Sequence, residues 1–416
     1  MPFVRSWPVR PFGVALLTAA CASPSAPRIA LPSPPAAASR AEPGRAVADV
    51  MDARSRKRGH EPLRWQPATT SPQPFQVAGP RGCDQPDAAL TRVASRLARR
   101  QARGDTELEL FDIVYAMRAE GAPYVWPRAL SLEAEDLPEA ELWGRLDRWL
   151  DDMPTPGVVR CGLADAQSTS GATVVAAVAV RSLCDLDPVP TRVRSGDWIT
   201  LRARPLVEVT DGKWIVLPPD RPPFAVPTTA GAHISGRFRA DRRGPWMAQL
   251  LVDAGYGPRP AAELMVFADL PPPAHIDERP APGEESLRST ADDRVALAIM
   301  VNGARRRAGL SALFRDPQLD ELAQHHAEAM ARTGRVGHDV GGGDPRLRLE
   351  AAGLLPLAAG ENVARATTSV RVHRALWASP SHRGNLLEPR FEALGVGAVR
   401  DASGSVWAVE LFADFQ

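Results

Sequence analysis

The sequence has 416 residues, which is enough for roughly two to four domains with hydrophobic cores of their own. Hydrophobic residues make up 44% and charged residues 24%, as in ordinary soluble globular proteins. The formal net charge of +1 provides no overall field that would attract nucleic acid or an anionic membrane, so we expect no nucleic-acid partner. No stretch reaches the about 18–20 apolar residues of a membrane-spanning helix.

The N-terminus has the features of an export signal. Arg5 and Arg10 precede a short apolar run over residues 12–17, and Thr18-Ala-Ala-Cys21 follows it. Small residues directly before a cysteine resemble a bacterial lipobox. We therefore predict a lipoprotein signal peptide over residues 1–21 and a lipid attached to Cys21. That lipid would anchor the protein at the bacterial cell envelope, in the outer membrane or periplasm. Ordinary secretion and an uncleaved N-terminus are the alternatives.

Residues 22–83 are rich in Pro, Ala and Arg, and we predict a disordered tether there. If Cys21 is lipidated, Cys83, Cys161 and Cys184 can form one disulfide and leave one thiol. We prefer the pair Cys161–Cys184, because both residues lie in one predicted unit. The other two pairings remain open.

Two folded regions are predicted before the last domain. Residues 84–190 have the pattern of an α+β domain, and residues 191–272 that of a small β-sandwich. In the α+β domain, the expected elements are helices over residues 90–98, 108–118 and 137–150 and a hairpin of residues 158–163 and 173–180. In the sandwich, Asp211-Gly212 predicts a tight turn between strands at residues 206–210 and 213–217. Residues 273–289 follow as a proline-rich linker.

Residues 290–416 mix helices and strands. Helices are expected from about residue 290 to Gly309, from the N-cap Asp316 to about Met330, and over residues 370–377. Strands at residues 394–399 and 406–413 close the chain. This pattern predicts a sheet with helices stacked over its faces.

Histidines gather in this last domain. Five of the eight are there: His325, His326, His338, His373 and His382. We expect His326 in the core, and His325 and His373 either at the surface or packed behind the site residues. His338 and His382 each follow a predicted helix. Between them, Gly360-Glu-Asn362 places an acid in a predicted tight turn.

Several motifs in this domain, taken in order, resemble a known family. Val301-Asn302, His326-Ala327 and His338 are similar to the opening of bacterial SCP-like CAP domains. Gly360-Glu-Asn362 matches that family's GEN motif, and Trp377-Ala-Ser-Pro-Ser-His-Arg-Gly-Asn385 matches its W-x-S-P-x-H-R-x-N motif. On these motifs the last domain is identified as a member of the CAP superfamily (cysteine-rich secretory, antigen 5 and pathogenesis-related proteins).

The resemblance implies an α-β-α sandwich with a cleft lined by His338, Glu361 and His382. Pro380 stands where many relatives have a further acid. Two imidazoles and a carboxylate are a credible partial metal site, so His338 and His382 are candidate ligands for zinc, the expected cofactor if there is one. The same residues could instead pair with one another in a non-catalytic cleft.

Four further residues are expected to support the cleft: Asn302, Asn362, Trp377 and Asn385. The amides of Asn302 and Asn385 would fix loops by satisfying backbone groups.

An internal repeat is a separate hypothesis. The strand, turn and strand after Val159 resemble those after Leu394, and each pair follows a helix with similar apolar spacing. Residues 84–185 would then be a degenerate CAP-like copy without His or a GEN motif. The alternative is an unrelated α+β domain, and a different strand order would exclude the repeat.

These observations predict an α+β protein that works as a surface-tethered, extracytoplasmic binding module. Its ligand would be a lipid, the cell wall or a protein, bound through the cleft. The alternatives are a metal-assisted hydrolase of peptide or ester bonds that uses His338, Glu361 and His382, and a structural envelope protein. The sequence does not indicate an oligomeric state.

Overall fold

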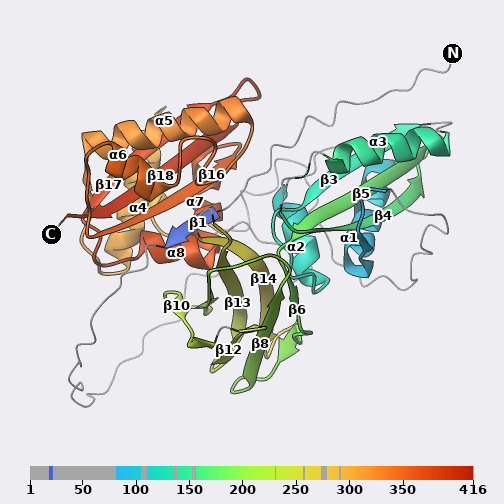
Figure 1. Ribbon diagram of the computed structural model, residues 1–416, viewed down its shortest axis with the longest axis horizontal. Coiled ribbons are helices and arrows are strands. Elements are labelled where there is room, and N and C mark those ends of the chain that lie inside the picture. Colours follow the sequence, from blue (N-terminus) through green and yellow to red (C-terminus); the bar gives the residue numbers. More distant parts are fainter. Residues whose placement is uncertain are drawn as a thin grey trace, which may run out of the picture.

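The computed structural model of the protein shows three folded units built on four β-sheets (Figure 1). The described residues are 18–21, 81–104, 110–134, 138–151, 153, 156–229, 231–255, 258–272, 279–289 and 292–415. We call residues 81–182 the N-terminal unit, residues 184–272 the β-sandwich and residues 279–415 the C-terminal unit. Of the predicted tether over residues 22–83, residues 22–80 lie outside the described residues.

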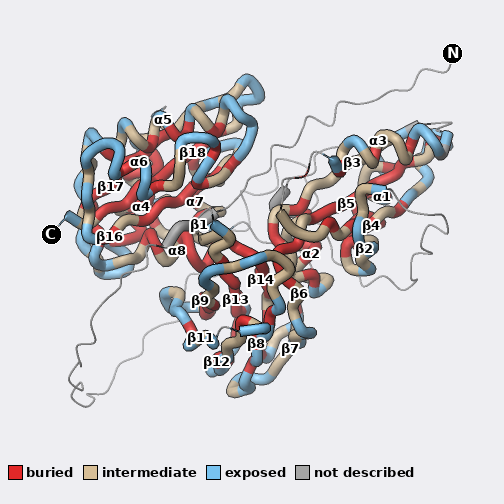
Figure 2. Tube along the Cα trace, viewed as in Figure 1, coloured by how far each residue is buried: buried red, intermediate tan, exposed pale blue. Residues whose placement is uncertain are grey.

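The C-terminal unit is an α-β-α sandwich, as the sequence predicts. Its helices are α4 (Asp293–Arg307), α5 (Pro317–Thr333), α6 (Pro345–Ala351), α7 (Ser369–Ala378) and α8 (Pro380–Leu386). Its own strands are β15 (Phe314–Arg315), β16 (Ala358–Ala366), β17 (Ala393–Arg400) and β18 (Val406–Asp414). Helix α5 packs on one face of the sheet through Leu319, Ala323 and Met330. Helices α4, α7 and α8 cover the other face (Figure 2).

Local signals explain why α5 begins and ends where it does. Asp316 accepts hydrogen bonds from the backbone N–H groups of Gln318 and Leu319, and Pro317 occupies the first turn. Gly334 ends the helix in the left-handed conformation, with φ 66°.

A short N-terminal strand extends this sheet. Strand β1 (Thr18–Cys21) pairs antiparallel with β16, so that Ala20 lies opposite Glu361 and Cys21 opposite Gly360. The rest of the predicted signal peptide lies outside the described residues.

The N-terminal unit has a sheet of the same topology. Its elements are β2 (Gln85–Pro86), α1 (Ala88–Ala102), α2 (Leu110–Ala119), β3 (Arg128–Ala134), α3 (Glu139–Asp151), β4 (Val158–Gln167) and β5 (Thr173–Ser182). The strand order β2-β4-β5-β3 repeats the order β15-β17-β18-β16. In both sheets the first pair is parallel and the other two pairs are antiparallel. The repeat hypothesis required this shared order.

The two sheets also agree residue by residue. Val178 pairs with Gly162 and Ala129, just as Leu411 pairs with Gly395 and Glu361. A Cβ added at Gly162 would lie 2.0 Å from the backbone nitrogen of Thr91 in α1. A Cβ added at Gly395 would lie 2.2 Å from the carbonyl carbon of Leu319 in α5. Both units therefore need glycine where a helix backbone touches the sheet.

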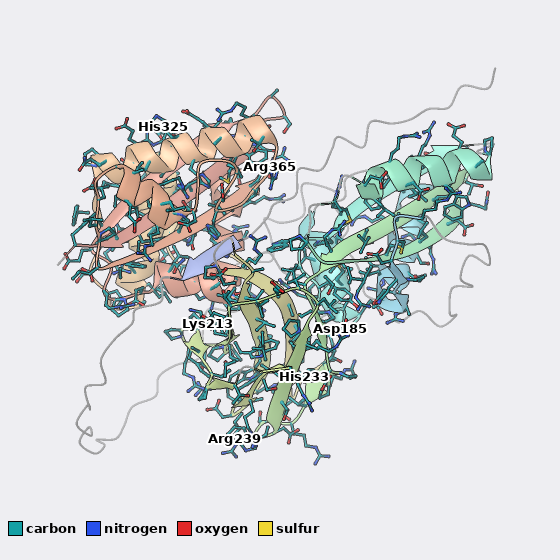
Figure 3. All side chains as sticks on the ribbon, viewed as in Figure 1. Asp185, Lys213, His233, Arg239, His325 and Arg365 are labelled. Carbon is teal, nitrogen blue, oxygen red and sulfur yellow. A yellow bond between two sulfur atoms is a disulfide. The ribbon has the colours of Figure 1, made fainter. Side chains whose placement is uncertain are left out.

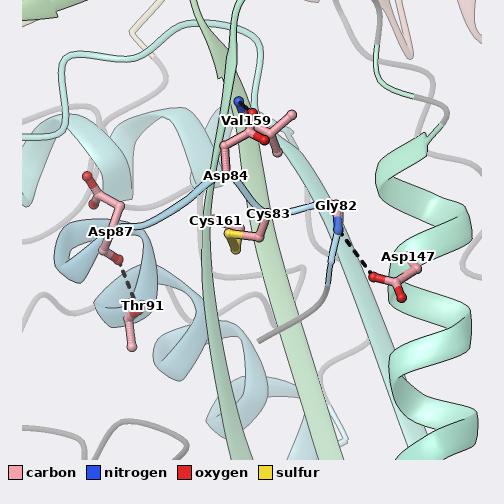
Figure 4. The surroundings of a disulfide bond; sticks show 8 residues. All are labelled: Gly82, Cys83, Asp84, Asp87, Thr91, Asp147, Val159 and Cys161. Carbon is pink, nitrogen blue, oxygen red and sulfur yellow. Dashed lines mark hydrogen bonds between the residues drawn. A yellow bond between two sulfur atoms is a disulfide. The ribbon is translucent and has the colours of Figure 1, made fainter. Parts of the chain in front are cut away.

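The preferred disulfide Cys161–Cys184 is wrong. Cys83 bonds to Cys161, with 5.9 Å between their Cα atoms, and Cys184 is a buried free thiol (Figure 4). The reason is the sheet order, because β2 follows Cys83 directly and pairs with β4 at Cys161. Cys184 starts a strand of the sandwich instead. Residues 82–83 thus belong to the N-terminal unit and not to the tether.

Two facing sheets form the predicted β-sandwich. One has the order β10-β9-β13-β14-β7 and the other β11-β12-β8-β6. The bounds are β6 (Cys184–Leu186), β7 (Arg192–Val193), β8 (Trp198–Pro205), β9 (Asp211–Leu217), β10 (Phe224–Ala225), β11 (Thr228–Thr229), β12 (Ile234–Arg239), β13 (Gly244–Asp253) and β14 (Pro258–Ala268). The predicted hairpin around Asp211-Gly212 is wrong. Residues 206–210 form no strand, and β9 pairs with β13 and β10.

The end of the predicted linker is also part of a folded unit. Ala281 is buried, and a short 3-10 helix, η1 (Glu284–Ser286), follows it. His373 donates a hydrogen bond from Nε2 to the carbonyl oxygen of Pro282 at 2.8 Å. His373 is thus buried, which excludes the first of its two predicted positions, the surface.

Candidate functional site

The GEN motif lies in strand β16 and not in the predicted tight turn. A Cβ at Gly360 would lie 3.0 Å from Asn385 Oδ1 and Phe391 Cζ, so a larger residue there would have to displace these side chains slightly. Successive residues of a strand point to opposite faces. Glu361 and Asn362 therefore belong to two different sites, one on each side of the sheet.

Glu361 is fully buried on the face covered by α5 and α6. Its Oε1 accepts a hydrogen bond from His338 Nδ1 at 2.8 Å, and its Oε2 accepts one from Arg348 Nη2 at 2.6 Å. Since a carboxylate only accepts, His338 carries its proton on Nδ1. His338 Nε2 and Arg348 Nη1 are buried and have no hydrogen-bond partner among the described residues. We call His338, Arg348 and Glu361 the GEN cluster.

His326 fixes the loop that carries His338. Its ring is buried and donates from Nε2 to the carbonyl oxygen of Gly337 at 2.8 Å. The same nitrogen lies 3.9 Å from Glu361 Oε1. The sequence predicts His326 as a core histidine, and this is confirmed. Its position next to the GEN cluster was not predicted.

The charge on Glu361 is fixed at neutral pH. Burial would raise the pKa of Glu361, but the Arg348 guanidinium, with His326 and His338, outweighs it and lowers that pKa to about 2. Burial lowers the pKa of His326, so this ring is neutral at neutral pH. Glu361 is thus a permanent carboxylate neutralised by an adjacent arginine.

Arg348 was not predicted, because helix α6 is only seven residues long. A usable signal was present. Asp344 caps α6 by accepting from the backbone N–H of Leu347, and Pro345 stands in its first turn. The same Asp-Pro pair begins α5.

His382 lies on α8 at the opposite face of the sheet. Its carbonyl oxygen accepts a hydrogen bond from Asn362 Nδ2 at 3.3 Å, and its side chain is fully buried. The hydrogen bonds and ion pairs described for the side chains of His338 and Glu361 run to each other, to Arg348 and to His326. The structure therefore brings two of the three predicted cleft residues together and leaves the third on the other side of the sheet.

A second buried cluster surrounds Asn362. Its Nδ2 also donates to Glu410 Oε2 at 3.0 Å, and its Oδ1 accepts from Asn385 Nδ2 at 3.0 Å. Burial raises the pKa of Glu410 to about 7, although the Asn362 hydrogen bond opposes the shift. Glu410 was not predicted as a site residue. It could have been found as the single acidic residue within the otherwise apolar strand that begins at Val406.

The remaining supporting residues hold loops and helix ends. Asn302 donates from Nδ2 to the carbonyl oxygen of Leu313 at 3.0 Å and accepts from the N–H of Leu313 at 2.8 Å. Trp377 lies under the guanidinium of Arg383, which is 4.4 Å from the centre of its ring. These contacts stabilise the frame around the sheet and lie outside the GEN cluster.

The GEN cluster does not fit zinc. Arg348 already neutralises Glu361 and occupies one of its oxygens, which leaves His338 Nε2 as the one imidazole nitrogen of this cluster that could bind a metal. His382, the other predicted ligand, lies across the sheet from them. Among the residues that the structure describes, no three His, Cys, Asp or Glu side chains are grouped to hold a metal ion.

Comparisons with known proteins agree with this fold. Residues 299–412 match the model of the CAP family, the cysteine-rich secretory protein family, so this part of the chain is a CAP domain. The uncharacterized protein YkwD of Bacillus subtilis (strain 168) is 33% identical over 110 residues. That match covers 26% of this chain and 42% of YkwD, less than half of the relative's length.

Two solved structures were also matched. An outer surface protein from Borrelia burgdorferi is 22% identical, with a TM-score of 0.29 over 31% of this chain and 97% of that one. An extracellular protein containing a SCP domain from Bacillus anthracis str. Ames is 16% identical, with a TM-score of 0.28 over 56% of this chain and 86% of that one. Of the helices described, none has the length and apolar character needed to span a bilayer.

Proposed function

We propose that the protein is an extracytoplasmic binding module whose ligand contacts the GEN cluster. The observation that carries the proposal is the pair of buried polar atoms that lack a partner among the described residues. Because His338 Nδ1 donates to Glu361, Nε2 accepts a hydrogen bond when the ring is neutral, and Arg348 Nη1 can only donate one. A hydroxyl or amide group can serve both atoms, so a cell-wall glycan, a peptide or a lipid headgroup has suitable chemistry.

The fixed charges favour binding over hydrolysis. A general base works best when its pKa lies near the working pH. The pKa of Glu361 is about 2, and Arg348 occupies one of its oxygens. The hydrolase alternative would need this carboxylate to take up a proton, which its surroundings oppose.

Cosedimentation with isolated peptidoglycan and with phospholipid vesicles tests the proposal. His338→Ala should weaken binding about tenfold, the factor expected from one lost buried hydrogen bond. His325→Ala is the matched control, because His325 is an exposed histidine of the same domain on α5 (Figure 3). Equal binding by the two variants would contradict the assignment, and product release that requires His338 would favour the hydrolase instead.

The lipid anchor at Cys21 is part of the same proposal and is supported by the lipobox-like sequence. Cleavage before Cys21 would remove Thr18–Ala20, three of the four residues of β1. Strand β16 would then be an open edge of the sheet. Labelling with a radioactive fatty acid should mark the wild-type protein and not Cys21→Ser. Labelling of both would exclude Cys21 as the attachment site.

A further inference from the structure

Two polar residues are buried on the outer face of the sheet that contains β13 and β14, the face opposite the apolar core of the β-sandwich. Gln249 in β13 and Glu263 in β14 lie opposite each other in the strand pairing. Gln249 is 0% exposed and Glu263 is 7% exposed. A buried amide and carboxylate lower stability unless their hydrogen bonds are satisfied. Most of the atoms that satisfy them come from outside the sandwich.

A row of hydrogen bonds runs through this pair from one end unit to the other. Arg118 of α2 forms an ion pair with Glu263 Oε2. Gln249 Nε2 donates to Glu263 Oε1 at 2.5 Å, and Gln249 Oε1 accepts from the backbone N–H of Ser381 at 3.1 Å. The carboxylate can only accept, so the amide nitrogen must face Glu263 and the amide oxygen must face α8.

The row ends at the start of helix α8. The first N–H groups of a helix have no partner within the helix. The N-cap residue Ser379 makes no capping hydrogen bond with its side chain, and Pro380 has no N–H. Ser381 is the first residue with a donor, and Gln249 supplies its acceptor. A residue of the β-sandwich therefore caps the helix that carries His382.

We infer that Gln249 is a positioning residue for α8, and that the row Arg118–Glu263–Gln249 couples the N-terminal unit to the CAP domain. The N-terminal unit and the β-sandwich are then working parts of the binding protein and not a spacer. The contact between α2 and β14 is reinforced by the backbone N–H of Glu263, which donates to the carbonyl oxygen of Pro123 at 2.8 Å. The inference is independent of the ligand proposed above.

Hydrogen exchange of the full chain, followed by mass spectrometry, tests the coupling. Gln249→Leu should make the amides at the start of α8 exchange about five- to tenfold faster, as expected for a lost helix cap. Arg118→Met should also speed exchange there, although Arg118 is in another unit. The double variant should exchange no faster than Gln249→Leu alone, because both changes break one row.

Gln324→Leu is the matched control. Gln324 accepts a hydrogen bond from the backbone N–H of Ala398 at 3.1 Å within the CAP domain, so its loss should leave α8 unchanged. Unaltered exchange at Ser381 in Gln249→Leu would overturn the cap, and unaltered exchange in Arg118→Met would overturn the coupling. If Gln249→Leu loosens the whole sandwich, Gln249→Met replaces it, because methionine keeps the length of the side chain without its acceptor, and exchange at the start of α8 is measured in the same way.

Discussion

Arg348 Nη2 lies 2.6 Å from Glu361 Oε2, and this ion pair places a fixed positive charge beside the carboxylate of the GEN motif. The carboxylate is fully buried and the arginine nearly so. Attraction between the two charges offsets part of the cost of removing them from water, and the loss of either partner leaves the other as an unpaired buried charge.

Replacing Arg348 should therefore destabilise the protein strongly. Arg348→Met leaves a buried carboxylate without its counter-charge, and we expect a loss of about 3–5 kcal/mol in the free energy of unfolding. Urea denaturation at pH 7 measures the loss. Arg346→Met is the control on the same helix, because Arg346 is exposed and its ion pair is with Glu350. A similar loss in both variants would show that the buried pair has no special role.

Glu361 should make stability fall in acid. Its pKa is about 2 in the folded protein, below the ordinary value of 4.5 expected for the unfolded chain. The folded state binds fewer protons between these values, so its stability is present above pH 4.5 and is lost as the pH falls towards 2. Urea midpoints measured from about pH 7 to pH 2 should show this loss. Glu361→Gln should flatten the curve in that window, and an unchanged slope would contradict the assignment.

Glu410 should have the opposite effect. Burial raises its pKa to about 7, above the ordinary value of 4.5, so the folded state holds a proton that the unfolded state releases. Stability should then fall as the pH rises from 4.5 through 7. Glu410→Gln should raise the melting temperature at about pH 8 and change it little at about pH 4. A larger gain in acid than in base would be inconsistent with a protonated Glu410.

The close helix contacts predict two sensitive glycines. Gly395→Ala and Gly162→Ala each force a methyl group into a helix backbone, and each should lower the free energy of unfolding by about 1–3 kcal/mol or more. Gly231→Ala is the control, because a Cβ there meets nothing within 4 Å. Thermal unfolding of the three variants compares them directly. If all three variants unfold at the same temperature, the helices must lie further from the strands than described.

The elements that could be predicted from the sequence are long ones whose apolar residues recur at a regular spacing. The apolar spacing of α1 and α5 and the paired strands β4–β5 and β17–β18 were all recognisable. Helices α6 and α8 were not, because seven residues hold too little periodicity. The GEN motif was interpreted as a turn because of Gly360. That glycine in fact allows β16 to approach Asn385 and Phe391.

Within the site, the link between His338 and Glu361 was predictable from ordered motifs. The position of His382 could not be predicted, because it depends on which face of the sheet α8 covers. The predicted disulfide Cys161–Cys184 was wrong for a similar reason. Cys83 meets Cys161 only through a sheet order that joins residues 78 positions apart.

The register shared by the two sheets shows which features of this architecture can be lost separately. The N-terminal unit has Ala129, Leu130 and Ala177 where the CAP domain has Glu361, Asn362 and Glu410. Its strand order is nevertheless complete. A unit of this architecture can therefore lack the buried polar groups of the GEN motif and still keep its strand order, provided that a glycine stands where the helix backbone touches the sheet.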